Sequence, residues 1–123
     1  MLDAQIQSYS GPLVVDTEDE TSNTKSLRPD QNDVRVSNTG SSDGTIYLPP
    51  VSQCRGKRFF FLKTDSGTQS VFIRPKGYVT SSLTGGDSFN WDGGEGYDMD
   101  AQYDDLWLES TGDAWVTLKN GIA

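Results

Sequence analysis

RFFFLKTDSGTQSVFIRP, residues 58–75, is the stretch that decides the fold. Two runs of aromatic and β-branched residues, which favour strands, flank the turn residues Asp65-Ser66-Gly67. This order predicts a β-hairpin. Working outward, TIYLPPV at 45–51 predicts a strand that ends at its two prolines, because proline cannot continue a ladder of hydrogen bonds. QYDDLWLESTGDAWVTL at 102–118 predicts a second hairpin around a tight turn.

The chain as a whole is expected to be all-β. No stretch has the apolar period of an amphipathic helix, and turn-forming residues are abundant. No segment repeats at a period of about 20–50 residues, and residues 78–101 are expected to be mostly loop. We therefore predict a small β-sandwich or barrel at about 45–120, within a β-module that spans 44–123. An extended N-terminal arm at 1–43 is expected to precede it.

The arm, residues 1–43, is polar and has few apolar residues to bury. Two short strands are expected in it, at 12–16 and 33–37, and the Arg28-Pro29 bond favours extended backbone between them. A segment of this kind is either disordered or ordered by lying along a partner, where it can cover a wide surface. By adding a strand to a partner's sheet, the arm would place valines in the partner's pockets, namely Val14, Val34 and Val36.

The strand expected at 58–64 is apolar on both faces. Phe59 and Phe61 point to one face, and Phe60 and Leu62 point to the other. A strand buried on both faces lies in the middle of a sandwich, a barrel or an interface. Because so small a module has a limited core, we predict a homotrimer, in which identical modules around a threefold axis bury the second face.

Composition excludes several classes of function. The net charge of −8 argues against a nucleic-acid partner, because phosphate contacts need clustered Lys and Arg. The longest apolar run, Phe59–Leu62, is far shorter than the roughly 20 residues of a membrane span. The chain has no histidine to complete a Ser-His-Asp or Cys-His site, so Cys54 is expected to be an ordinary small residue. We predict no enzyme activity, no catalytic residue and no cofactor.

Charge is distributed unevenly along the chain. Residues 55–76 carry six basic side chains and one acid, and residues 87–113 carry nine acids and no base. The two segments either pair across neighbouring strands of one sheet or meet across a subunit boundary. The seven carboxylates at 87–105 are hard-oxygen ligands that suit calcium. Their spacing does not match an EF-hand loop, so a solvated acidic loop without metal is favoured.

The three tryptophans, Trp91, Trp107 and Trp115, have two interpretations. Exposed aromatic rings on a β face can stack on sugars. More often, a tryptophan in an alternating strand fills a core or an interface, because burial of its large apolar area is favourable. We favour a core or interface position for these residues.

The order of several short motifs suggests a family. They are Thr45-Ile46-Tyr47-Leu48-Pro49-Pro50, Gly56-Lys57, Lys63-Thr64-Asp65-Ser66, Val71-Phe72-Ile73, Ala101-Gln102-Tyr103, Leu106-Trp107-Leu108-Glu109-Ser110 and Gly112-Asp113-Ala114-Trp115. In this order and spacing, residues 45–118 resemble a small β-module that recurs in virion proteins of tailed bacteriophages. The resemblance implies a structural protein of a phage particle, usually trimeric, on either the capsid surface or a fibre.

The segments outside the module distinguish a protein of the capsid surface from a fibre protein. Fibre proteins with such modules are usually long, with repeats, heptads or collagen-like stalks, and this chain has none of these. A stand-alone module with an arm resembles a capsid decoration (cement) protein, which binds the outer shell and stabilises capsomer contacts. A head or tail fibre, or a receptor-binding component, is the alternative, and an unrelated β-rich binding protein is the third hypothesis.

The resemblance also implies partners and a location. The expected partners are the major capsid protein and further copies of the chain, and the expected location is the outer capsid surface of the virion. Because MLDAQIQSYS lacks the basic start and apolar stretch of a secretory signal, synthesis in the bacterial cytoplasm is expected. The residues predicted at the subunit or capsid interface are Val14, Val34, Val36, Phe59, Phe60, Phe61 and Trp107.

Overall fold

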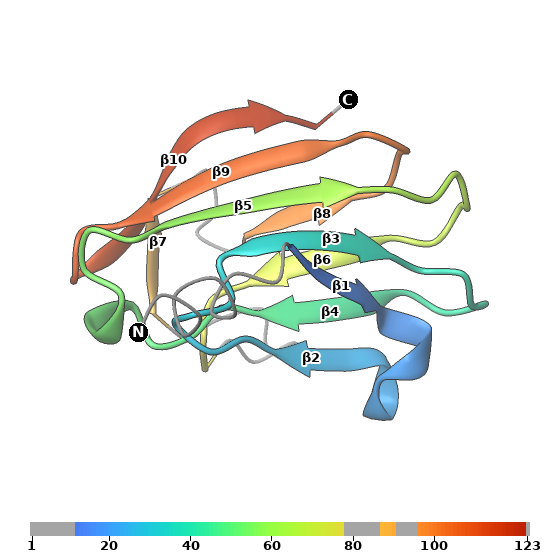
Figure 1. Cartoon of the computed structure of the whole chain (residues 1–123), viewed down its shortest axis with the longest axis horizontal. Helices are drawn as coiled ribbons and strands as arrows, with labels where there is room; N and C mark the ends of the chain where they lie inside the picture. Colours follow the sequence, from blue (N-terminus) through green and yellow to red (C-terminus); the bar gives the residue numbers. More distant parts are fainter. Residues whose placement is uncertain (1–11, 78–86, 91–95, 123) are drawn as a thin grey trace, which may run out of the picture.

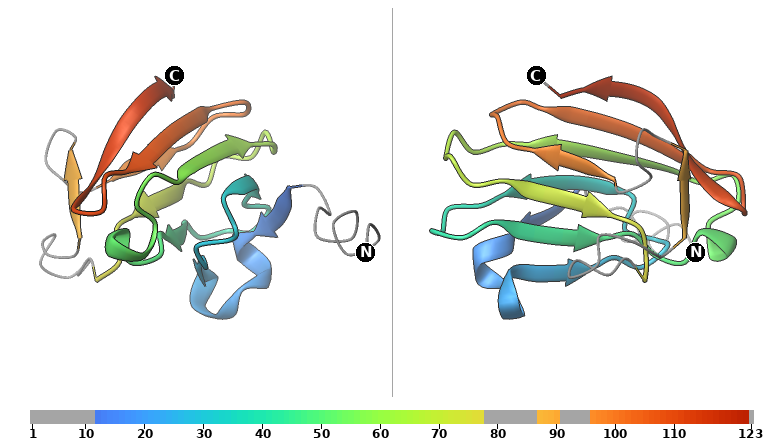
Figure 2. Two further views of the ribbon diagram at one scale, coloured as in Figure 1. Left: turned by 60° about the vertical axis from the view of Figure 1, so that its left-hand side comes forward. Right: turned by 180° about the vertical axis from the view of Figure 1, so that it is seen from behind.

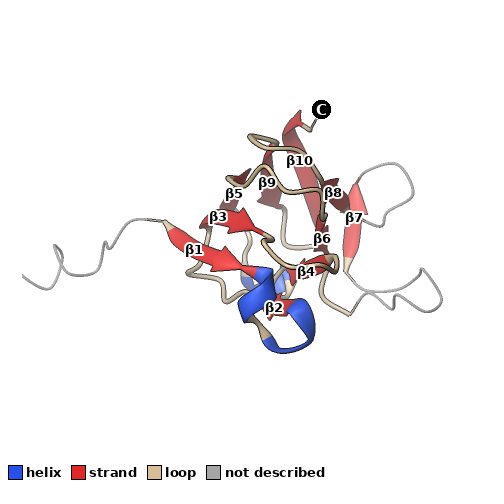
Figure 3. Cartoon of the chain, turned by 90° about the vertical axis from the view of Figure 1, so that its right-hand side faces the viewer, coloured by secondary structure: helices blue, strands red, loops and turns tan. Residues whose placement is uncertain are grey.

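A computed structural model describes residues 12–77, 87–90 and 96–122, and it is built from two mixed β-sheets that face each other (Figure 1). Strands make up 46% of the structure and there is almost no helix, which confirms the all-β prediction. Figure 3 shows the two sheets from the side, as two layers with β1, β3 and β5 in one and β2, β4 and β6 in the other. Among the described residues the sheets do not close into a barrel.

Sheet A has six strands in the order β1-β3-β5-β9-β10-β7. Their bounds are Leu13–Asp16 (β1), Asp33–Ser37 (β3), Arg58–Lys63 (β5), Asp105–Ser110 (β9), Ala114–Gly121 (β10) and Ser88–Asn90 (β7). Sheet B has four strands in the order β2-β4-β6-β8, seen from outside in the right-hand view of Figure 2. Their bounds are Thr24–Ser26, Gly44–Tyr47, Val71–Arg74 and Tyr97–Met99. Three short 3₁₀ turns connect strands: η1 (Thr17–Asp19), η2 (Thr21–Asn23) and η3 (Val51–Gln53).

The first six strands form three successive coils of a solenoid. Coil 1 is β1 and β2, coil 2 is β3 and β4, and coil 3 is β5 and β6, so that each coil places one strand in each sheet. Neighbouring coils pair in parallel in both sheets. Paired residues of coils 1 and 2 are 21 apart in sequence in both sheets, and those of coils 2 and 3 are 27 apart. For each pair of neighbouring coils, the offset between paired residues is the same in sheet A and sheet B, so the two strands of a coil stay in step.

The prediction that nothing repeats is therefore wrong. Residues 13–27, 34–48 and 61–75 occupy equivalent positions in the three coils. The sequence hides this repeat for two reasons. The equivalent residues share apolar alternation but little identity, and the connection at 49–57, which contains η3, makes the second interval longer than the first. The coils share only the positions whose side chains face inward, because alternation along a strand determines those positions. Many apolar residue types can fill them, so the coils need not share residue identities.

The hairpin predicted at 58–75 is also wrong. β5 lies in sheet A between β3 and β9, whereas β6 lies in sheet B between β4 and β8. The turn residues Asp65-Ser66-Gly67 carry the chain from one sheet to the other instead of folding it back within one sheet. By contrast, the hairpin predicted at 102–118 is confirmed, because β9 and β10 pair antiparallel, with a bulge between Thr117 and Lys119. Gly112 supplies the left-handed backbone of its turn, with φ of 94°.

Residues 12–43 do not form a separate arm, so the predicted boundary between 43 and 44 is wrong for this part of the chain. The two strands expected at 12–16 and 33–37 are confirmed as β1 and β3. Both belong to sheet A, and Val34 and Val36 are fully buried. The segment has too few apolar residues to bury alone, but each coil buries the inner face of the next. Residues 1–11 lie outside the described part.

Antiparallel strands close one end of the coils. β8 pairs with β6 in sheet B, and β9 pairs with β5 in sheet A, so coil 3 is covered in both sheets. Trp115 of β10 is fully buried there, with its ring 5.2 Å from Phe59 in an edge-to-face arrangement. Residues 78–101, expected to be mostly loop, contain the short strands β7 and β8. Within the described residues, β1 and β2 remain the last strands of their sheets at the opposite end.

A polar corner connects sheet A to sheet B. The carboxylate of Asp16 accepts hydrogen bonds from the backbone N–H and the hydroxyl of Thr39, at 3.2 and 2.7 Å. Asp65 accepts one from the backbone N–H of Asn38 at 3.2 Å. Lys63, fully buried at the inner side of the corner, donates to Asp65 at 2.8 Å. Carboxylates thus bind the backbone of a neighbouring coil and hold the coils in register.

Candidate functional site

The outer face of sheet A carries two of the four large hydrophobic side chains that are exposed among the described residues, Val14 and Trp107. Along each strand, alternate residues point into the core, and the others point to this face. The residues that we group as the outer face are Val14, Asp33, Arg35, Arg58, Phe60, Leu62, Trp107 and Glu109. They come from β1, β3, β5 and β9, four neighbouring strands that can be followed in Figure 1.

Phe60 and Trp107 form an aromatic pair at the centre of the outer face. They are register partners on β5 and β9, and their ring centroids lie 4.6 Å apart with planes tilted by 42°. Trp107 keeps 37% of its surface exposed, whereas Trp115 has none. Trp115 therefore lies in the core, which confirms the prediction of a core or interface position for this residue. Trp107 does not lie in the core, and its position at an interface stays a prediction. Trp91 lies outside the described residues.

Two ion pairs flank the aromatic pair. Arg35 pairs with Asp33 on the same strand, β3, and its guanidinium lies 5.1 Å from the centroid of the Phe60 ring. Arg58 of β5 pairs with Glu109 of β9 at 2.9 Å, across the ladder that joins the two strands. Each guanidinium is thus matched by a carboxylate. The Arg58–Glu109 pair joins the basic and acidic segments within one sheet, as the first of the two interpretations expected.

These side chains enclose a shallow pocket of about 400 Å³, which we call the aromatic pocket. Its lining residues are Asn32, Asp33, Arg35, Arg58, Phe60 and Trp107. The backbone N–H of Phe60 donates to the carbonyl of Asn32 at 2.9 Å, which fixes the position of Asn32 beside the rings. The pocket therefore has an aromatic floor and a rim of planar polar groups. Sequence reasoning identified the two rings but not Asn32, Asp33 or Arg35, because only the coil register brings β3 beside β5.

The predicted interface residues separate into two groups. Val14, Phe60 and Trp107 lie on the outer face. The other four, Val34, Val36, Phe59 and Phe61, are fully buried in the core and have no surface to offer a partner, so their assignment to an interface is wrong. Sheet B covers the inner face of β5, so a second subunit could be needed only to cover the outer face of this strand. The homotrimer stays a prediction.

A second candidate surface is the open end of the solenoid, which we define as β1, β2 and the turns η1 and η2 between them. Val14 of β1 is 75% exposed there. β1 ends at an acidic residue, Asp16, and the turn that follows it is also acidic, with Glu18, Asp19 and Glu20. Figure 3 shows β1 and β2 at the same end of the two layers, joined by these turns. Edge strands that end a sheet are templates for pairing with another chain.

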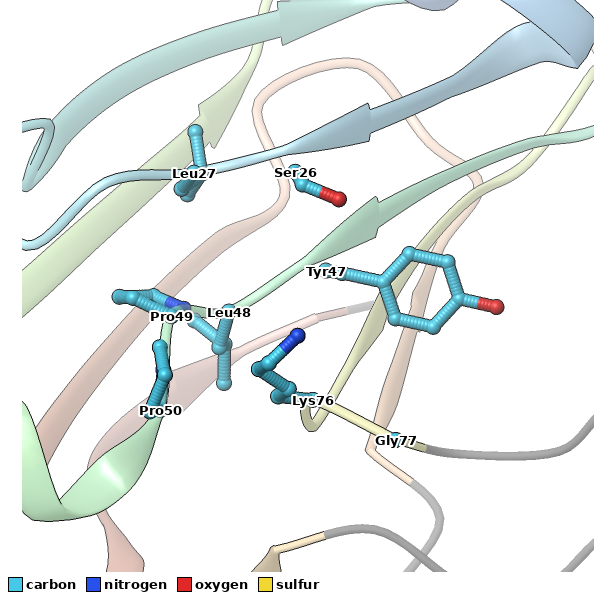
Figure 4. A pocket seen from close by; sticks show the side chains of 8 residues that line it. All are labelled: Ser26, Leu27, Tyr47, Leu48, Pro49, Pro50, Lys76 and Gly77. Atoms are coloured by element: carbon cyan, nitrogen blue, oxygen red, sulfur yellow. The ribbon is translucent and has the colours of Figure 1, made fainter.

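Another hollow, of about 330 Å³, lies at the corner where β2 and β4 end. Figure 4 shows the side chains that line it. Tyr47, Lys76 and two prolines, Pro49 and Pro50, contribute to its walls. One wall is formed by Lys76 and Gly77, and residues 78–86, which follow directly, lie outside the described part. We assign no ligand to this hollow.

The acidic segment shows no metal centre in the part that can be described. Among the described residues, no group of three His, Cys, Asp or Glu side chains is placed to hold a metal ion. Burial raises the pKa of the Asp98 carboxyl, and the neighbouring charges of Asp100 and Asp43 add to this effect. Burial likewise raises the pKa of the Cys54 thiol. Asp92 and Glu95, two of the predicted calcium candidates, lie outside the described residues.

Comparison of the chain with protein-family models, with curated proteins and with solved structures found no match. In the described residues, no helix is long and apolar enough to cross a membrane.

Proposed function

We propose that the protein is a structural component of a tailed-phage particle, a capsid decoration protein that binds the major capsid protein on the outer shell. The observation that carries this proposal is the open end, where the described part of both sheets ends at short parallel strands and Val14 is 75% exposed. The resemblance of residues 45–118 to a virion module supports the same class of function.

The open end suits strand addition. An extended segment of a capsid protein placed beside β1 would gain main-chain hydrogen bonds and would cover Val14. The acidic residues that follow β1, Glu18, Asp19 and Glu20, favour a capsid segment that carries Lys or Arg at the matching end. This mode of docking replaces the free arm, because residues 12–43 are built into the sheets.

A trimer would strengthen this attachment. Three open ends held in one particle would multiply modest individual affinities through effective concentration. Because the composite surface exists only where capsomers meet, binding would stabilise the assembled shell by mass action.

The test is to add purified variants back to shells stripped of the protein. Val14→Lys should weaken shell binding strongly, because a charged side chain on an edge strand opposes strand pairing. Glu18→Lys combined with Asp19→Lys should weaken it further, whereas Val14→Thr, which keeps the β-branched shape, is the matched control. Equal binding by all four proteins would contradict docking through the open end.

A head or tail fibre, or a receptor-binding component, is the second candidate. The aromatic pocket favours it, because an exposed tryptophan among planar polar groups suits a ligand on a cell surface. In the same add-back experiment, this candidate predicts binding to host cells and none to stripped shells.

A further inference from the structure

We propose that the aromatic pocket binds one neutral hexopyranose unit of a polysaccharide or glycan. The inference concerns a surface separate from the open end, and it holds whether the protein decorates a shell or belongs to a fibre. It depends on three features of the pocket, namely its floor, its rim and its charge.

The floor of the pocket offers an apolar surface of the right kind. A pyranose ring has a face of C–H groups, which are slightly positive and pack well against the negative face of an aromatic ring. Trp107 is held by the ladder between β5 and β9 and by its contact with Phe60, yet 37% of its surface remains exposed. A rigid ring on a sheet can receive a sugar with little loss of side-chain entropy.

The rim of the pocket supplies hydrogen-bonding groups of several kinds. Asn32 presents an amide, which both donates and accepts, and Asp33 presents a carboxylate that accepts. Arg35 and Arg58 donate from planar guanidinium groups. Arg35 is held by its ion pair with Asp33 and lies over the Phe60 ring, so its orientation is largely set before a ligand arrives. The Arg58 side chain is 65% exposed, so its ion pair restrains it only weakly. Paired hydroxyls on adjacent sugar carbons match such planar, two-atom partners.

The charge of the pocket selects a neutral sugar. The two guanidinium groups, of Arg35 and Arg58, are each matched by a carboxylate, of Asp33 and Glu109 respectively. An acidic sugar or a phosphate would therefore find no unmatched positive charge here. The volume of about 400 Å³ lies within the range of small-ligand sites, about 300–1,000 Å³.

A protein occupant is the alternative that the experiment separates from a sugar. The cores of protein–protein interfaces are enriched in Trp, Phe and Arg, and the pocket contains such residues, namely Phe60, Trp107, Arg35 and Arg58. The same cores are depleted of Asp, and Asp33 also lines the pocket. This carboxylate favours a sugar, because sugar hydroxyls can replace the water that a protein surface would remove from it.

The experiment is a glycan array that contains neutral and acidic oligosaccharides, followed by calorimetric titration with maltohexaose, cellohexaose and any neutral glycan that the array detects. We expect binding of at least one neutral hexose-containing glycan, with Kd below about 1 mM. Trp107→Ala should weaken this binding at least about tenfold, and Trp107→Phe should retain most of it. Leu118→Ala is the matched control, because Leu118 is exposed on β10 but does not line the pocket.

Several results would overturn the inference. They are binding of no glycan, binding of acidic glycans alone, or equal binding by wild type and Trp107→Ala with an unchanged near-ultraviolet circular dichroism spectrum. Loss of shell binding by Trp107→Ala, without any glycan binding, would instead make the pocket a protein contact. The Val14→Lys variant separates the two proposals, because it should no longer bind shells but should still bind the glycan.

Discussion

Lys63 occupies an inward position that the other two coils fill with valine. Its register partner in coil 2 is Val36, whose own partner in coil 1 is Val15, and all three side chains are buried. A lysine tolerates this place because Asp65, two residues later, lies within 2.8 Å of its ammonium group. The sequence alone did not predict this pair, because alternation counts Lys63 as a break in the apolar face. Only the coil stacking shows that it points inward.

This arrangement predicts an asymmetry between the two partners. Asp65→Ala leaves a buried ammonium group without a counterion and should lower the free energy of unfolding by about 3 kcal/mol. Lys63→Met places an apolar side chain where the other coils have valine, so it should cost less than about 1 kcal/mol. Urea unfolding followed by tryptophan fluorescence measures both values. Equal losses of unfolding free energy in the two variants would mean that Asp65 does not stabilise the fold by compensating the buried charge of Lys63.

The same pair predicts sensitivity to acid. Burial acts to raise the pKa of the Asp65 carboxyl, but the hydrogen bonds from Lys63, Asn38 and Gly67 outweigh it and hold the pKa below its ordinary value of 3.8. A carboxyl with a lowered folded-state pKa contributes stability that is present above the unfolded pKa and is lost as the pH falls through the folded pKa. The urea midpoint should therefore fall more steeply below pH 3.8 in wild type than in Lys63→Met combined with Asp65→Asn. Parallel pH curves would contradict this.

Coils are the unit of structure at the next scale, and they explain which elements the sequence could predict. The β9–β10 hairpin was predictable because its turn, its strands and its pairing are all local. The strands β1, β3, β4, β5 and β6 were located correctly, but their parallel partners are 21 or 27 residues away. The three-residue strands β2, β7 and β8 were not predicted. The Asp-Ser-Gly turn at 65–67 serves a crossing between sheets as well as a hairpin, and local turn chemistry does not distinguish the two.

The coil architecture predicts the behaviour of a truncated chain. A protein of residues 44–123 lacks β1, β2 and β3, so β4 and β5 each lose a strand that pairs with them. The inner face of β4 also loses the part of sheet A that β1 and β3 supply. It should lack a cooperative thermal transition and should elute as aggregate on size exclusion, since an exposed apolar edge of this kind pairs with other chains. Val14→Ala in the full-length chain is the control and should unfold as wild type does. A well-folded, monomeric 44–123 fragment would instead support the prediction that residues 1–43 form a separate arm.

At the scale of the whole molecule, two surfaces formed by the described residues carry the proposed contacts. The open end presents strand edges beside acidic turns, and the outer face of sheet A presents the aromatic pocket. Three of the predicted interface residues, Val14, Phe60 and Trp107, lie on the outer face, and their contact with a partner stays a prediction. The sequence alone could not distinguish these three from the four buried residues, Val34, Val36, Phe59 and Phe61. Each strand of a sandwich buries one of its two faces, and the residue types on the two faces are similar here.

The central claim is that this chain coats the outer shell of a phage head, and cryo-electron microscopy of particles with and without the protein tests it most directly. Stripped shells should show no density at the decorated sites, and addition of the full-length chain should restore density over the capsid surface where capsomers meet. The Val14→Lys variant should leave those sites mostly empty. Density confined to the tail or a fibre, or no density on any part of the particle, would contradict the claim.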